Sequence, residues 1–195
     1  LDDNAQPVYY QRTENAKPPG LLGYDFKVQP KGTLTYFDRQ QGKHIELNDR
    51  YEVINTWKPK NDFREDHHDL QLLPGGRNFL LAFDERVMNL SCVARGGKRD
   101  AKVLGIVVQE QNDRQEGVWE WNGWDHFKLA DSSHTVLTDT LVDYVHGNSI
   151  VLDTDGNIII SSRNLDEVTK IDYRTGKILW RLGGQQNQFT FVNDP

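Results

Sequence analysis

The sequence predicts an all-β protein and, within that class, a β-propeller. Three observations support this prediction. Short runs of β-branched and aromatic residues recur at strand length between turn residues. Groups of four such runs occur three times, closing at Trp57, Trp121 and Trp180. No long segment has the periodicity of an amphipathic helix. A four-stranded unit repeated along a chain is typical of propeller blades.

Length and composition bound the possibilities. The chain of 195 residues can bury one sizeable core, its apolar fraction of 36% suits a loop-rich all-β domain, and we expect no second domain. A net charge of −6 without a cluster of basic residues argues against a nucleic-acid-binding surface. No apolar run is long enough to span a membrane. The single cysteine, Cys92, excludes an internal disulfide and is expected to be buried.

The first blade is predicted over residues 23–57, after an N-terminal entry segment over residues 1–22 that contains three prolines. Four strand-like runs make up this blade, with turn residues between them, of which Gly32 follows the first run. They cover residues 24–28, 33–37, 44–47 and 51–57.

The second blade is predicted over residues 68–121. Its first two runs flank the turn at residues 74–76, and an insertion over residues 88–102 separates the second from the third. The four runs cover residues 68–73, 78–83, 102–108 and 117–121.

The third blade is predicted over residues 146–182, after a second insertion over residues 122–145. Its runs cover residues 148–152, 158–161, 168–173 and 175–180. The first two runs flank the turn residues Asp155-Gly156-Asn157, where glycine can adopt a positive φ. If these runs pair as a hairpin, His146 before the first and Arg163 after the second lie at the same end.

A propeller closes with roughly four to eight blades, and only three are visible here. The sequence stops directly after the last strand of a blade. We therefore expect the 195 residues to be part of a longer protein, with the propeller region at residues 23–195 truncated before its next blade.

Register between the blades indicates a candidate site. His68 and Asn148 occupy the same position, eight residues before the turn glycines Gly76 and Gly156. Because first strands line the central channel of a propeller, these residues should converge with His146 and Arg163 at its mouth. Asp69 and Asp143 are expected to orient the imidazoles. The alternative is structural, since histidines near strand starts also tie adjacent blades together by hydrogen bonds.

A metal site is the weaker interpretation of the same residues. His67, His68, Asp69, Asp125, His126 and His146 could supply ligands, but their spacing matches no metal-binding motif, and we expect neither a metal nor a cofactor.

Five motifs in chain order resemble the arylsulfotransferases that do not use a nucleotide sulfate donor. The resemblance covers roughly residues 50–195. The motifs lie at residues 67–76, 119–127, 143–149, 161–163 and 171–184, and the most specific are His-Gly-Asn-Ser, beginning at His146, and Ser-Ser-Arg, ending at Arg163.

The resemblance implies a six-bladed propeller that transfers a sulfuryl group from an aryl sulfate to a phenol through a transiently sulfated histidine. By motif, His68, His146 and Arg163 are implied as catalytic residues. Apart from the resemblance, we expect His67, Asn148, His126 and Tyr144 to contact the substrate. Trp124, Phe127 and Tyr144 could hold aryl rings, although aromatic residues near the ends of blades more often serve packing. The resemblance also suggests a periplasmic or extracellular location, and it says nothing of oligomeric state.

One departure from the family pattern bears on activity. The nucleophilic histidine of the family follows the equivalent of residues 189–195, so it is expected beyond this sequence, and the 195 residues alone are expected to be inactive.

Two other functions remain open. The run from Ile171 to Trp180 is also similar to the blade motif of quinoprotein dehydrogenases, although its Thr-Gly-Lys-Trp element is clear only once. A propeller that binds a ligand without catalysis would share the blades but would lack the downstream histidine.

Overall fold

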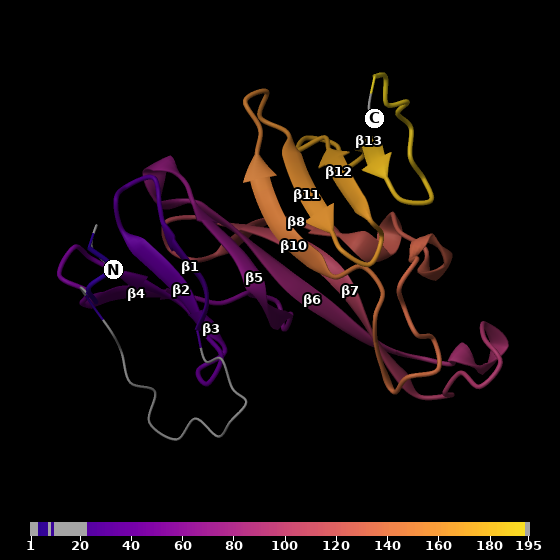
Figure 1. Cartoon of the computed structure of the whole chain (residues 1–195). Coiled ribbons are helices and arrows are strands. Elements are labelled where there is room, and N and C mark those ends of the chain that lie inside the picture. The colour runs from indigo at the N-terminus through magenta and orange to yellow at the C-terminus, as the bar shows by residue number, and fades with distance from the viewer. Residues whose placement is uncertain (1–3, 8, 10–22, 194–195) are drawn as a thin grey trace. The chain divides into compact units, whose positions relative to one another are not determined.

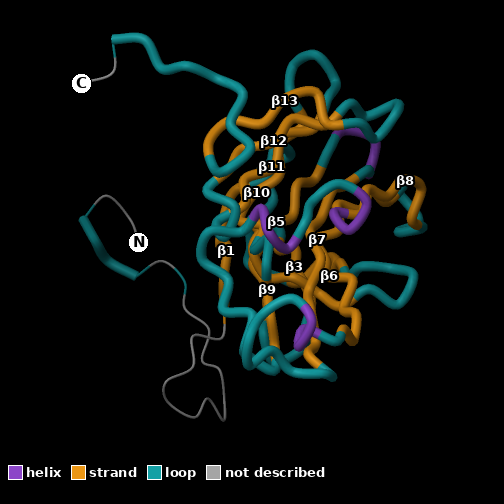
Figure 2. The backbone as a smooth tube through the Cα atoms, turned by 90° about the vertical axis from the view of Figure 1, so that its right-hand side faces the viewer, coloured by secondary structure: helices purple, strands orange, loops and turns teal. Residues whose placement is uncertain are grey.

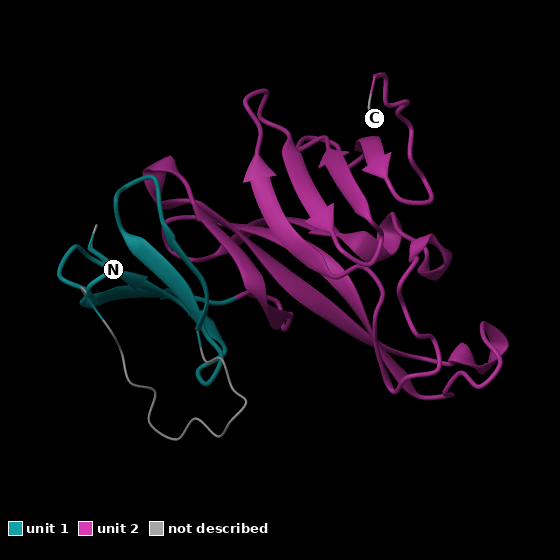
Figure 3. Ribbon diagram, viewed as in Figure 1, with its two compact units in different colours: residues 1–58 teal, residues 59–195 magenta. Residues whose placement is uncertain are grey.

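The computed structural model describes residues 4–7, 9 and 23–193. The expected entry segment at residues 1–22 therefore lies largely outside the described residues. The chain divides into two compact units, residues 1–58 and residues 59–195 (Figure 3), and each is described separately below.

Thirteen strands and four short 3-10 helices make up the described chain (Figure 1). The strands are β1 (Gly23–Val28), β2 (Leu34–Asp38), β3 (Lys43–Leu47), β4 (Val53–Trp57), β5 (Arg64–Leu72), β6 (Asn78–Met88), β7 (Ala101–Gln111), β8 (Gly117–Asn122), β9 (Leu141–Asp143), β10 (Gly147–Leu152), β11 (Ile158–Ser162), β12 (Glu167–Ile171) and β13 (Ile178–Gly183). The helices are η1 (Pro74–Gly76), η2 (Leu90–Cys92), η3 (Gly123–Asp125) and η4 (Leu129–Asp131). The predicted all-β class is confirmed. No described helix is long and apolar enough to cross a membrane.

Three antiparallel sheets contain these strands, and in each the strands pair in chain order. The first unit holds β1-β2-β3-β4, and the second holds β5-β6-β7-β8 and β10-β11-β12-β13. Gly32, Gly76 and Gly156 each have φ near 80°, the left-handed conformation that their turns require. Strand β9 is an addition that pairs in parallel with β7.

Strands β6 and β7 are longer than the sequence pattern predicts. The apolar run ends at Phe83, but backbone pairing continues to Met88 and Ala101. Charged residues in this part of β6 do not show the apolar pattern by which a strand is predicted. An ion pair of 2.8 Å between Lys102 and Glu85 links the two strands here. Cys92 is the last residue of η2 and is exposed, so the prediction that it is buried was wrong.

One hydrophobic core joins the two sheets of the second unit. It includes Phe79, Ile106 and Val108 from one sheet and Ile150 and Ile160 from the other, each at most 1% exposed. Strand β10 lies beside β5 (Figure 2), and the buried carboxylate of Asp69 accepts a hydrogen bond of 2.7 Å from the backbone N–H of Ile150. Because this contact crosses from one sheet to the other, it holds the strand that carries His68 against the strand that follows His146.

Candidate functional site

Two imidazoles meet in the second unit. The rings of His68, on β5, and His146, directly before β10, pack edge to face with their centroids 4.7 Å apart. The two residues come from different sheets and from distant parts of the sequence. The structure therefore brings together the two histidines that register and motif had singled out.

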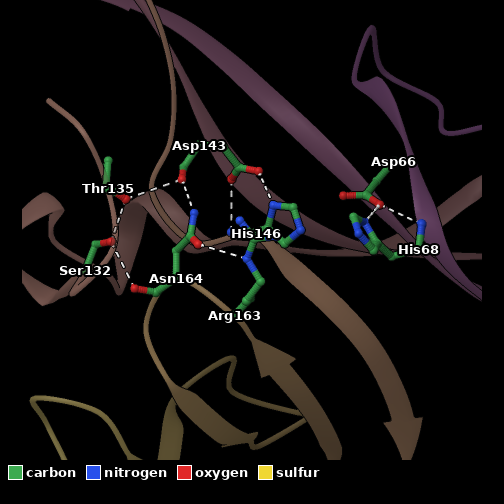
Figure 4. Close-up of polar contacts among 8 residues, drawn as sticks. All are labelled: Asp66, His68, Ser132, Thr135, Asp143, His146, Arg163 and Asn164. Carbon is green, nitrogen blue, oxygen red and sulfur yellow. Dashed lines mark hydrogen bonds and ion pairs between the residues drawn. The ribbon is translucent and has the colours of Figure 1, made fainter. Parts of the chain in front are cut away.

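The hairpin predicted to bring Arg163 close to His146 is present. Strands β10 and β11 pair from Leu152 and Ile158 to Gly147 and Ser162. Beyond the last pair, the N–H of Arg163 donates to the carbonyl oxygen of His146 over 2.9 Å. Figure 4 shows the contact of the His146 side chain with Asp143 and the hydrogen bond of the Arg163 side chain to Asn164.

Backbone conformation at His146 is unusual. Its φ of 53° lies in the left-handed region, which histidine occupies more readily than most residues. The carboxylate of Asp143 stabilises this turn, because Oδ1 accepts the N–H of His146 over 3.0 Å and Oδ2 contacts Nδ1 of the same residue over 2.6 Å. Asp143 thus has the orienting role predicted for it.

Asp66 orients His68. Oδ1 of Asp66 lies 2.7 Å from Nδ1 of His68 and also accepts its backbone N–H over 2.7 Å. Oδ2 of Asp69 accepts the backbone N–H of Ile150 over 2.7 Å, so this carboxylate oxygen serves the contact between the two sheets. Pairing between β5 and β6 shifts register between Glu65 and Leu70, and a local irregularity of this kind changes which side chains share a face.

Each histidine is thus held at Nδ1 by a carboxylate. A carboxylate at one ring nitrogen favours the tautomer that carries its proton there, which leaves Nε2 to act on a ligand. The sequence contains a signal for Asp66, since a carboxylate shortly before an imidazole occurs in both Asp66-His67-His68 and Asp143-Tyr144-Val145-His146.

The surroundings of His68 favour its charged form. Burial lowers the pKa of His68, but the hydrogen bond and the charge of Asp66, with the charge of Asp143, outweigh both burial and the opposing charge of Arg163. The pKa is therefore raised above the usual 6.5. When it is protonated, His68 adds a positive charge to that of Arg163, and both side chains can donate hydrogen bonds to an anion.

Replacing Asp66 by asparagine is expected to lower the pKa of His68. Burial and the charge of Arg163 both lower this pKa, and the substitution removes the carboxylate that raises it. An NMR titration of the His68 ring would measure the shift. In the native protein the raised pKa adds stability that is complete below pH 6.5 and is lost as pH rises through the folded-state value. Asp66→Asn should weaken that dependence.

Asp166→Asn is the matched control, since it removes a carboxylate from an exposed pair with His134, 2.9 Å apart, and should leave the His68 curve unchanged. An unaltered pKa of His68 in Asp66→Asn would contradict the assigned role of Asp66.

The other predicted site residues differ in their placement. His67 lies at the site, with its ring centroid 3.9 Å from that of His68. Asn148 is exposed on β10, two residues after His146. His126 instead stacks on Trp121, with a centroid separation of 4.7 Å, and burial lowers its pKa against the opposing charge of Asp125.

Tyr144 and Phe127 belong to the core. Tyr144 is 0% exposed, its hydroxyl donates to the carbonyl oxygen of Phe127, and burial raises its pKa. Phe127 is 3% exposed. Neither ring presents a surface to a substrate in this structure, because the insertion that carries them folds back onto the sheet. Trp124 contacts Tyr144 at 5.1 Å and donates from Nε1 to the carbonyl oxygen of Asp84.

Among the described residues, one group could hold a metal ion. Asp66, His67 and His68 offer three ligand atoms within 4.8 Å of one another. Oδ2 of Asp66 is buried without a hydrogen-bond partner, so it could accept an ion. Nδ1 of His68 is already engaged by Asp66 Oδ1, however, and an ion bound there would compete with that contact.

Comparison with known proteins identifies a family. The chain matches the family model described as Arylsulfotransferase (ASST) over residues 4–190. No curated protein matches the chain. Among solved structures, a similar one is a protein of unknown function from Bacteroides caccae, with 7% identity and a TM-score of 0.37. The match covers 82% of this chain and 60% of that protein, so the chain spans less than two thirds of its length.

Proposed function

We propose, from the premise that the chain belongs to the arylsulfotransferase family, that His68, His146 and Arg163 bind the sulfuryl group of an aryl sulfate during its transfer to a phenol. The observation that carries the proposal is the meeting of two carboxylate-held imidazoles from different sheets, 4.7 Å apart, with Arg163 paired to the backbone of His146.

A propeller framework is part of the proposal. Three antiparallel sheets of consecutive strands support it, as does the contact between Asp69 on β5 and Ile150 on β10, because both are first strands of their sheets. In such a framework these strands line a common channel, and the site lies beside the start of β10, with His68 coming from the middle of β5.

Sulfuryl transfer, like phosphoryl transfer, passes through a loose, in-line transition state with negative charge spread over equatorial oxygens. Donors fixed around those oxygens lower the barrier. Nε of Arg163 donates a hydrogen bond to Oδ1 of Asn164. In the proposed complex this leaves the two Nη groups of Arg163 for the sulfuryl oxygens. An imidazolium such as His68 adds a second positive charge and can also donate a proton from Nε2.

The proposed reaction has two steps. In the first, the bond between sulfur and the aryl oxygen breaks while sulfur bonds to a histidine nitrogen, and the departing phenolate takes a proton from an imidazolium of the site. In the second, the acceptor phenol gives its proton to the imidazole left neutral by the first step, and its oxygen displaces the histidine nitrogen from sulfur. The nucleophilic histidine is the one that the family resemblance implies beyond residue 195. No metal or nucleotide takes part.

The full-length protein, incubated with 4-nitrophenyl sulfate and an acceptor phenol, tests this function. We expect nitrophenol release that depends on the acceptor, formation of the acceptor sulfate, and, with donor alone, a protein whose mass has increased by one sulfuryl group. Binding of the aryl sulfate without any transfer would contradict the proposal and indicate a binding module. Release of nitrophenol with no acceptor sulfate would indicate a hydrolase.

A further inference from the structure

We propose that Asn164 is a positioning residue that joins Arg163 to the Asp143–His146 pair, so that guanidinium and imidazole are held in one geometry. This inference rests on the proposed function. Asn164 directly follows Arg163, is 6% exposed, and does not need to touch the substrate to act.

Both the oxygen and the nitrogen of the Asn164 side-chain amide make hydrogen bonds. Its Oδ1 accepts a hydrogen bond of 3.2 Å from Nε of Arg163, and its Nδ2 donates over 2.5 Å to the carbonyl oxygen of Asp143. The carboxylate of the same Asp143 holds Nδ1 of His146. One side chain therefore links the permanent cation of the site to the residue that orients its imidazole (Figure 4).

Asn164 is itself held by its backbone. Its N–H donates to the carbonyl oxygen of Val145 over 3.1 Å, and its own carbonyl oxygen accepts from Ser132 Oγ over 2.9 Å and from the N–H of Ser133 over 3.0 Å. Thr135 Oγ1 contacts the carbonyl oxygen of Asp143 at 3.4 Å. The loop that follows η4 thus contacts the backbone of both Asn164 and Asp143, the two residues that this hydrogen bond joins.

Such a link matters because the side chain of Arg163 is exposed. A free arginine side chain loses rotamer entropy when it is ordered. A bond at Nε orders the guanidinium before an anion binds and leaves both Nη groups for that anion. Misplacement of a binding group by about 1 Å can reduce the rate about 10²-fold.

Variants of Asn164 in the full-length protein test the inference by sulfuryl-transfer kinetics. We expect Asn164→Ala to lower kcat/KM about 10- to 100-fold, and Asn164→Asp, which keeps an acceptor for Arg163 but loses the donor to Asp143, to lower it less. Asn112→Ala is the matched control, because Asn112 bonds to backbone N–H groups in the turn between β7 and β8. It should retain full activity.

A double-mutant cycle separates positioning from a general structural effect. If Asn164 acts through Arg163, Asn164→Ala should change kcat/KM little when Arg163 is already alanine. A reduction by the same factor in both backgrounds would overturn the inference, as would full activity of Asn164→Ala.

A measurement that does not depend on turnover keeps the two proposals distinguishable. The NMR signal of the Arg163 Nε–H should exchange with solvent more quickly in Asn164→Ala than in the wild type. An inactive wild type with this change would reject the proposed function and retain the positioning role. Equal exchange in both proteins would reject the positioning role, whatever the activity.

Discussion

Replacement of Arg163 by alanine in the full-length protein is expected to lower kcat/KM for sulfuryl transfer by about 10²- to 10³-fold, the usual effect of removing one donor from a site that stabilises developing negative charge. The guanidinium cannot lose its proton and presents two Nη groups in a fixed fork. Because its Nε is held by Asn164, this fork is set before the donor binds. Steady-state release of nitrophenol from 4-nitrophenyl sulfate measures the loss.

Arg163→Lys distinguishes charge from geometry. Lysine retains the positive charge but lacks the planar fork, so its kcat/KM should lie between those of the wild type and the alanine variant. Arg114→Ala is the control, since Arg114 lies in the exposed turn between β7 and β8. Kinetics of Arg163→Ala equal to those of the wild type would remove this residue from the proposed site.

Replacement of Arg181 by methionine is expected to destabilise the protein by about 3–5 kcal/mol, the typical cost of breaking a buried ion pair by removing one partner. The side chain of Arg181 is 12% exposed, and its Nε donates to both carboxylate oxygens of Glu167, over 2.7 and 2.8 Å. Its Nη1 lies 3.2 Å from Asp131. Loss of the guanidinium would leave two buried carboxylates without this cation.

Urea unfolding, followed by tryptophan fluorescence, measures this change as a lower midpoint. Glu167→Gln in the Arg181→Met background should recover part of the loss, because it removes one of the two unpaired charges. Arg174→Met, in the exposed turn between β12 and β13, should change stability by no more than about 0.5 kcal/mol. A loss below about 1 kcal/mol for Arg181→Met would show that the buried network is not required for stability.

Local patterns in the sequence predicted much of the fold. Alternating apolar residues and turn glycines located most strands, because burial of one face and a positive φ each require particular residue types at particular positions. The same patterns missed the outer part of β6, residues 84–88, where charged residues continue the pairing with β7 beyond the apolar run. They also missed β9, which is three residues long and pairs with a strand far away in the sequence.

Prediction of proximity succeeded where two residues flank one local hairpin. His146 and Arg163 flank a hairpin, so the turn between them was sufficient to predict their proximity. Prediction failed where it depended on the direction of one side chain. Asp66 and Asp69 both lie near His68 in the sequence, and spacing alone does not show that Asp66 contacts Nδ1 of His68. Phe127 and Tyr144, two candidates for holding aryl rings, pack into the core, which was the alternative role considered for them.

By itself, the sequence determined the all-β class, the hairpin that pairs Arg163 with His146, and the motifs that the family shares, since each depends on residues close together in the chain. Only the tertiary structure decided that Asp66 holds His68 and that Asn164 links Arg163 to Asp143. Contacts of this kind are set by how two sheets and an inserted loop pack, and the direction of a side chain across such a junction cannot be inferred from spacing alone.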